Sequence, residues 1–129
     1  MRQEIDAHTD DLARQVVDAA LKVHKAMGPG LLESVYEACL AYELKSLNIP
    51  FETQVSLPII YQDMKLDAGL RLDMVVAKRI IVELKSVETL LPIHQSQLIT
   101  YLKLSGLRLG LLINFNVRLL RDGIKRIAY

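Results

Sequence analysis

The sequence contains one cysteine, no tryptophan and no long hydrophobic run. A single cysteine excludes a disulfide within the chain, and Cys39 falls in an apolar helical pattern typical of a small buried side chain. A helix that crosses a membrane needs about 18 or more consecutive apolar residues, and no segment approaches this length. The first residues, MRQEIDAHTDD, are polar and acidic, unlike a secretory signal. We therefore expect a cytoplasmic protein that does not bind membranes.

The chain also lacks a strong excess of charge of either sign, since its formal net charge is +1. This balance is not typical of a strongly basic nucleic-acid-binding protein. The charges are unevenly distributed, however: residues 1–63 carry ten acidic and five basic side chains, whereas residues 100–129 carry six basic side chains and one acidic side chain. The basic segment is suited to contact phosphate groups. A solvated strand edge and helix face explain the same pattern equally well.

Apolar residues make up 51% of the 129 residues, which is enough for one domain, residues 1–129, with a buried core. A helical repeat of apolar side chains predicts three helices, with Thr9 as the N-cap of the first, at residues 9–27, 31–47 and 92–105. Alternating patterns and short apolar runs predict five strands, at residues 51–61, 70–76, 80–85, 109–115 and 124–128. This order predicts an α/β fold in which helices flank a mixed central sheet.

Of the charged residues within two apolar predicted strands, three point to a chemical site: Asp73 in one strand, and Glu83 and Lys85 in the next. Glu83 and Lys85 are two positions apart, so their side chains point to the same face of the sheet. If residues 77–79 form the turn, Asp73 lies directly opposite Glu83, with Cβ atoms about 5 Å apart. Two carboxylates at this separation repel each other in an apolar setting, and a divalent cation between them removes the conflict.

The same three residues predict hydrolysis of a phosphodiester bond. A bound metal ion lowers the pKa of a water molecule and polarises the phosphoryl group. Lys85 would then orient the attacking water, help to deprotonate it, or stabilise the charge that develops on the phosphate. The alternative is a half-buried ion pair on a wet strand face, between Glu83 and either Lys85 or Arg71.

Two predicted helices offer further candidates. Glu33 lies near the start of the second helix, where it can serve as a third metal-binding carboxylate or simply interact favourably with the helix dipole. Gln97 and Tyr101 are four residues apart on the third helix, so they share a face that either binds phosphate oxygens or marks the edge of the apolar side. His24 and His94 are weaker candidates for a metal ligand or a proton shuttle, because most helix histidines lie on the surface.

Three segments resemble the small bacterial GxxExxY proteins: MGPGLLESVYE, which contains Gly30, Glu33 and Tyr36, IIVELKSVE and LGLLINFNV. The resemblance covers residues 21–127. That family is grouped with the PD-(D/E)XK nuclease superfamily, whose core is αβββαβ. The resemblance therefore implies this core with one extra N-terminal helix. It also implies that Glu33 matches the helix glutamate of many RecB-like members.

The resemblance implies roles for other residues as well. Asp73 matches the superfamily aspartate, and Glu83 and Lys85 match its E-x-K pair. Residues 97–101 match a Q-x3-Y element of RecB-like members. Leu72 stands where the superfamily pattern has a proline, which is a tolerated departure in so loose a pattern.

We interpret the chain as a nuclease that depends on Mg²⁺ or Mn²⁺ and cleaves DNA or RNA. The predicted site residues form three groups: catalytic Asp73, Glu83 and Lys85; metal-binding Asp73, Glu83 and Glu33; and substrate-binding Arg71, Gln97 and Tyr101. Two other functions fit the same residues. One is a catalytically silent nucleic-acid-binding or accessory domain, and the other is a module that dimerises through an exposed strand at residues 51–61 or 124–128. We expect a partner protein or a second copy to supply specificity, because so short a chain lacks a domain for it.

Overall fold

The computed structural model describes residues 4–129, apart from the side chain of residue 68. Its elements are α1 (Ala7–Met27), α2 (Glu33–Ser46), β1 (Phe51–Tyr61), β2 (Met64–Val76), β3 (Ile80–Lys85), α3 (Pro92–Ser105), β4 (Leu109–Asn114), the 3₁₀ helix η1 (Leu120–Gly123) and β5 (Ile124–Ala128). The strands form one sheet in the order β1-β2-β3-β4-β5, in which β3 and β4 are parallel and the other neighbours antiparallel. The predicted α/β fold with a mixed sheet and an extra N-terminal helix is confirmed.

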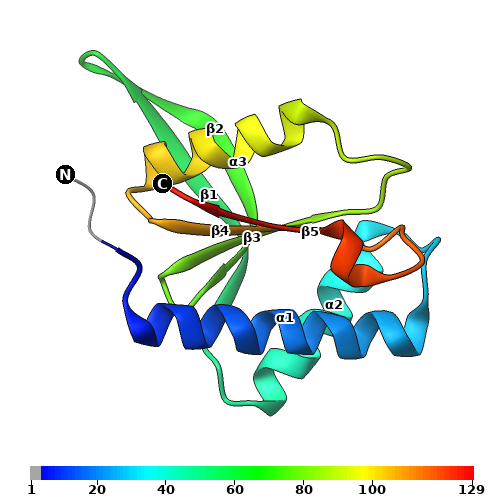
Figure 1. The fold of residues 1–129 in the computed structure, drawn as a ribbon. Coiled ribbons are helices and arrows are strands. Elements are labelled where there is room, and N and C mark those ends of the chain that lie inside the picture. The colour runs from blue at the N-terminus through cyan, green and yellow to red at the C-terminus, as the bar shows by residue number, and fades with distance from the viewer. Residues whose placement is uncertain (1–3) are drawn as a thin grey trace.

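Helices cover both faces of the sheet (Figure 1). α1 and α2 pack on one face, where they form the larger core with Val82 and Leu84 of β3. α3 packs on the opposite face through Leu98 and Leu102. Because side chains alternate along a strand, Glu83 points to the face that α3 covers. Within residues 4–129, no helix is long and apolar enough to cross a membrane.

The N-cap of α1 is Asp6, so the prediction of Thr9 is wrong. The carboxylate of Asp6 accepts a hydrogen bond from the backbone N–H of Thr9 at 2.8 Å. This is the bond by which an N-cap side chain satisfies a free N–H in the first turn. Thr9 itself lies inside the helix and is buried. The predicted end of the helix is confirmed, since its C-cap is Gly28, with a φ of 72°.

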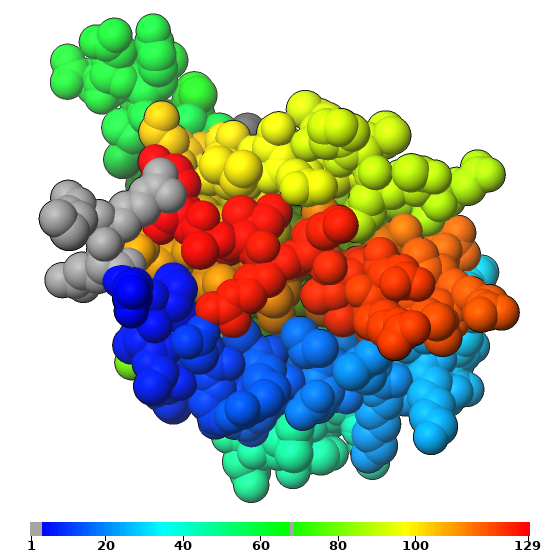
Figure 2. Space-filling model, in the orientation of Figure 1, coloured from blue at the N-terminus to red at the C-terminus, as the bar shows by residue number. Residues whose placement is uncertain are grey.

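β1 and β2 form a long hairpin whose far end projects from the body of the protein (Figures 1 and 2). β2 begins earlier than the sequence predicts, because Tyr61 already pairs with Met64 across the tip. As Pro58 predicts, β1 is an edge strand, and its register shifts after Leu57. Gly69 lies against this irregularity, where a Cβ atom would stand 2.3 Å from the backbone oxygen of Leu57. Only glycine therefore allows β1 and β2 to approach each other this closely.

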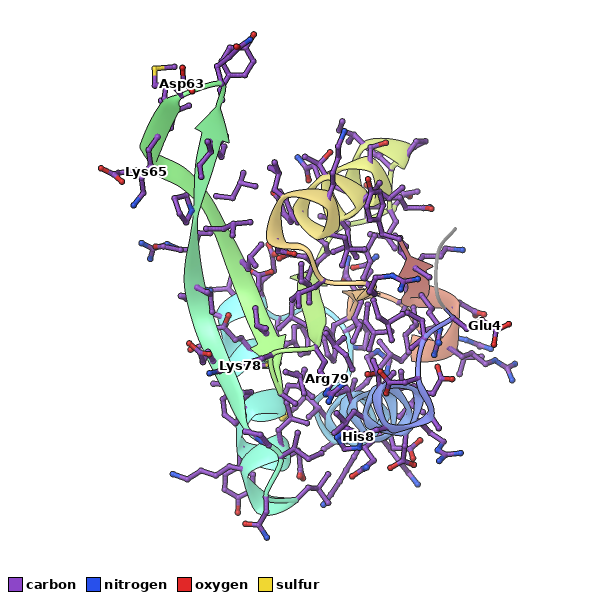
Figure 3. The ribbon with its side chains drawn as sticks, turned by 90° about the vertical axis from the view of Figure 1, so that its left-hand side faces the viewer. Glu4, His8, Asp63, Lys65, Lys78 and Arg79 are labelled. Carbon is purple, nitrogen blue, oxygen red and sulfur yellow. The ribbon has the colours of Figure 1, made fainter. Side chains whose placement is uncertain are left out.

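A tight turn joins β2 to β3, at the end of β2 that lies away from the projecting tip (Figure 3). Val76 pairs with Ile80, which is the register that the sequence predicts. The backbone N–H of Arg79 donates to the carbonyl of Val76 at 2.9 Å, and Ala77 and Lys78 have φ values of 51° and 55°. Residues with a Cβ atom seldom adopt positive φ values, so the flanking strands hold this turn in a strained form.

Candidate metal and catalytic site

Asp73 and Glu83 lie together where β2 and β3 separate; we refer to them as the acidic pair. Regular pairing of the two strands stops at Met74 and Val82, and the same register extended by one residue brings Asp73 opposite Glu83. At this point, hydrogen bonds from backbone N–H groups to side-chain carboxylates replace the hydrogen bonds between the two backbones. The N–H of Asp73 donates to Oε1 of Glu83 at 3.2 Å, and the N–H of Leu84 donates to Oδ2 of Asp73 at 2.9 Å. The backbone of each strand thus holds the carboxylate of the other.

The pairing between β1 and β2 is also interrupted at Asp73. The residues on either side of Asp73 pair with β1, whereas Gln54, which stands opposite, has a φ of 51° and is skipped. β2 therefore leaves both ladders at the same residue. This break in the sheet explains why the N–H of Asp73 is available to the Glu83 carboxylate instead of to a backbone carbonyl.

The two carboxyl groups are in electrostatic conflict. Glu83 is only 6% exposed. Burial, followed by the negative charge of Asp73, raises the pKa of Glu83 from 4.5 to about 8. The hydrogen bond from the Asp73 backbone and the positive charge of Lys85 lower this pKa, but they do not offset the rise. At neutral pH and without a cation, Glu83 therefore keeps its proton for most of the time.

A hard divalent cation suits the oxygen ligands of the acidic pair, and its charge would remove the repulsion between them. Within residues 4–129, no group of three or more His, Cys, Asp or Glu side chains lies close enough to hold a metal ion. The acidic pair by itself would offer a cation two protein ligands. This number fits Mg²⁺, which proteins commonly bind through one or two carboxylates, with water and phosphate oxygens as the remaining ligands.

Lys85 ends β3 two positions after Glu83, on the same face of the sheet, and its side chain is partly buried. Its charge acts on the Glu83 carboxyl group, because it lowers the pKa of that group. None of the salt bridges among the described residues involves Lys85, Glu83 or Arg71. The alternative of an ion pair between Glu83 and either basic residue is therefore absent. Arg71 lies exposed on β2, two residues before Asp73.

α3 brings Tyr101 close to the acidic pair. Leu98 and Leu102 fix the helix on the sheet, and Tyr101 packs at the edge of the same cluster. Burial, and then the negative charges of the acidic pair, raise the pKa of Tyr101, so its phenol group is near both carboxyls. Gln97 lies one helical turn earlier on the same side and is exposed. Tyr101 is therefore near the acidic pair, and Gln97 lies on the same side of α3.

Glu33 is the first residue of α2, and its side chain is exposed. The structure does not gather it with the acidic pair into a three-ligand group within the described range. The start of α2 nevertheless lies beside the end of β3, because the hydroxyl of Ser86 donates to the carbonyl of Leu31 at 2.6 Å. Its role as a third metal ligand remains a prediction.

The two histidines have structural partners. Nε2 of His24 forms a hydrogen bond with the carbonyl of Val117 at 2.8 Å, and the ring is buried. Nδ1 of His94 accepts a hydrogen bond from the N–H of Leu91 at 3.0 Å, at the start of α3. Neither ring belongs to a cluster of metal-binding side chains in the part of the chain that the structure describes.

Asn114 is a further residue near the site that the sequence patterns do not predict; it is 2% exposed and pairs with Lys85 in the parallel register of β3 and β4. Its Oδ1 accepts a hydrogen bond from the N–H of Val87 at 3.0 Å, and its Nδ2 donates to the carbonyl of Val87 at 2.9 Å. The amide therefore fixes the chain that follows Lys85. The sequence feature that points to Asn114 is its place as the single polar residue at the end of the apolar strand LGLLIN.

Two basic side chains of the C-terminal segment have partners in the fold. Arg126 forms a salt bridge with Asp10 of α1. Nε of Arg108 donates a hydrogen bond to the carbonyl of Tyr129 at 2.7 Å. Contact between this segment and phosphate groups remains a prediction.

A family model described as the PD-(D/E)XK nuclease superfamily matches residues 10–127. The comparisons with curated proteins and with solved structures gave no match. The matched range runs from α1 to β5 and contains the acidic pair and Lys85. Because this model covers nearly the whole chain, the protein belongs to the PD-(D/E)XK nuclease superfamily.

Proposed function

We propose that this protein is a Mg²⁺- or Mn²⁺-dependent nuclease of the GxxExxY group, which hydrolyses phosphodiester bonds of DNA or RNA. The acidic pair is the observation that carries the proposal. Backbone N–H groups hold the two carboxylates together, and burial and mutual repulsion raise the pKa of Glu83 to about 8. Such an arrangement is unfavourable in the absence of a cation, and a divalent ion between the oxygens offsets the repulsion.

In this proposal Asp73 and Glu83 would hold the metal ion, with Glu33 as a third ligand. When bound, such an ion would lower the pKa of a water molecule and polarise the phosphoryl group. Nζ of Lys85 donates hydrogen bonds to the attacking water or to the phosphate oxygen on which negative charge develops. The strand position of Lys85, two residues after Glu83, keeps its ammonium group beside the acidic pair.

Three residues around the acidic pair are proposed to bind the substrate. The exposed guanidinium of Arg71 suits a bidentate contact with phosphate. The pKa of Tyr101 is raised, so its hydroxyl stays protonated and can donate to a phosphate oxygen. The amide of Gln97, one turn away on α3, provides both a donor and an acceptor. A cytoplasmic location, and a partner protein or second copy that supplies specificity, complete the proposal.

Cleavage assays with the purified chain test this function. Labelled single- and double-stranded DNA and RNA are incubated with Mg²⁺, with Mn²⁺ or with EDTA. We expect cleavage that requires the metal and that falls by roughly 100-fold or more in Lys85→Ala, as removal of a hydrogen-bond donor to developing negative charge does. Lys45→Ala, at the exposed end of α2, is the matched control and should cleave like the wild type. Equal cleavage by Lys85→Ala and wild type would indicate a contaminating nuclease and refute the proposal.

A catalytically silent nucleic-acid-binding domain is the second candidate. It is favoured by the position of Glu33, because within residues 4–129 this side chain does not form a three-residue cluster with the acidic pair, as the proposed third ligand would. This function predicts binding that weakens steeply with salt, without cleavage in either metal. Fluorescence anisotropy with labelled oligonucleotides, measured beside the cleavage assay, distinguishes the two functions.

A further inference from the structure

A chain of contacts links the end of β3 to the start of α2 through β4. The backbone carbonyl of Lys85 accepts a hydrogen bond from the N–H of Phe115 at 2.9 Å. The ring of Phe115 stacks on the ring of Tyr36, with centroids 4.4 Å apart and an interplanar angle of 9°. Both rings are fully buried. The position of Tyr36, in the first turns of α2, is therefore fixed relative to the backbone of Lys85.

The hydroxyl groups of Tyr36 and Ser86 both bind the backbone of the loop before α2. The hydroxyl of Tyr36 donates to the carbonyl of Gly28 at 2.6 Å and accepts from the N–H of Leu31 at 3.1 Å. The hydroxyl of Ser86 donates to the carbonyl of Leu31 at 2.6 Å. Ser86 directly follows Lys85. These contacts therefore form a closed series that begins at the carbonyl of Lys85 and returns to the next residue, Ser86.

The loop between α1 and α2, residues 28–32, which these contacts hold, has no regular secondary structure. Gly28 and Gly30 have φ values of 72° and 97°, and Pro29 between them has no N–H to donate. Both backbone groups of Leu31 are bound by side-chain hydroxyls rather than by other backbone groups. The hydroxyls of Tyr36 and Ser86 therefore hold the backbone two residues before Glu33, the first residue of α2.

We propose that Ser86 and Tyr36 are positioning residues for Glu33. Their hydroxyls hold the first turn of α2 at the end of β3, where the Glu33 carboxylate approaches a cation bound by the acidic pair. The inference rests on the proposed function, because only a metal at the acidic pair gives Glu33 a ligand to approach. The side chain of Glu33 makes no hydrogen bond or ion pair among the described residues, whereas the contacts of Tyr36 and Ser86 hold the backbone just before it.

Metal titration tests the role of the hydroxyls directly. Binding of Mn²⁺ to the full chain is measured by calorimetry, without substrate, for wild type, Ser86→Ala and Ser86→Thr. We expect Ser86→Ala to weaken Mn²⁺ binding about tenfold, as the loss of a group that orients a metal ligand does, and Ser86→Thr to restore it. Ser46→Ala is the matched control, since it removes a hydroxyl-to-carbonyl hydrogen bond of 3.0 Å at the other end of α2. It should leave Mn²⁺ binding unchanged.

A double-mutant cycle shows whether Ser86 acts through Glu33. In a Glu33→Gln background, the further change Ser86→Ala should alter Mn²⁺ affinity by less than about twofold, because the ligand that it positions is already lost. A tenfold loss in both backgrounds, or no loss in either, would overturn the inference. Tyr36→Phe provides an independent measurement, because it keeps the stacked ring and removes only the hydroxyl. Tyr42→Phe, exposed on the same helix, is its control.

Asp73→Asn separates failure of this inference from failure of the proposed function. If Asp73→Asn binds Mn²⁺ like the wild type, the metal does not lie at the acidic pair and the proposed function itself is refuted. If Asp73→Asn loses the metal while Ser86→Ala and Tyr36→Phe bind it normally, only the positioning role fails. Circular dichroism of each variant before titration establishes that the compared proteins are folded, and the Tyr36 and Ser86 variants test the role independently of each other.

Discussion

The stability of the metal-free protein should fall as pH rises, because Glu83 binds its proton more tightly in the folded state than in the unfolded chain. The pKa of Glu83 is about 8 in the fold and 4.5 is its ordinary value. A raised folded-state pKa contributes stability that is fully present below about pH 4.5 and is lost as pH rises through about 8. At about 1.4 kcal/mol for each pH unit between these values, the loss is on the order of 5 kcal/mol.

Urea unfolding, followed by circular dichroism in EDTA between pH 5 and pH 9, measures this loss. Glutamine has the shape of the protonated acid and no ionisation, so Glu83→Gln should keep its free energy of unfolding where the wild type loses it. The difference between the two proteins should therefore grow with pH. Glu88→Gln, at an exposed position just after β3, should follow the wild type. Parallel curves for wild type and Glu83→Gln would refute the buried, coupled carboxyl described above.

Asp73→Asn separates the two causes of the raised pKa. Burial is the larger cause and the negative charge of Asp73 is the second. Asparagine removes the charge and nearly preserves the shape, so the loss of stability with pH should become smaller without disappearing. A curve as flat as that of Glu83→Gln would mean that repulsion, rather than burial, dominates.

Two further changes should alter stability in opposite directions, and the same urea titrations measure both. Lys78→Gly should raise the free energy of unfolding by about 0.5–1 kcal/mol, because its φ of 55° strains a residue with a Cβ atom; Lys65→Gly, at an extended position of β2, should lower it. Asn114→Ala should lower it by about 2–3 kcal/mol, because both backbone groups of Val87 lose a buried partner. A loss below about 0.5 kcal/mol would mean that water replaces the amide.

The register that forms the acidic pair was predictable because it depends on local rules. The alternation of side chains places Glu83 and Lys85 on one face, and a turn at residues 77–79 fixes which residue of β2 stands opposite Glu83. Both rules involve neighbours in the sequence, and Val76 does pair with Ile80. The helix that carries Tyr101 was predictable for a similar reason, since Pro92 begins it and Gly106 ends it.

Features that depend on distant partners were not predictable. The early start of β2 was not predicted, although Met64 and Leu66 alternate with Lys65 and Asp67, because Asp67 and Gly69 are residue types that strands disfavour. Asn114 and Ser86 read as ordinary polar residues. Each of these side chains binds a backbone group that is far away in the sequence, Leu31 for Ser86 and Val87 for Asn114. These groups come close only when the chain folds. Single-residue patterns carry no information about such partners.

Metal ion and proton compete for the same carboxylate, which connects the stability of this protein to its proposed chemistry. At neutral pH a cation that enters the acidic pair must displace the proton of Glu83, so metal affinity should rise with pH up to about 8. The same cation should restore the stability that the metal-free protein loses at high pH, because it binds only the folded state. A glutamine or an apolar residue at position 83 would avoid the conflict altogether. A buried pair of acids that loses this much stability when both ionise is explained if the metal-bound form is the working form of the protein.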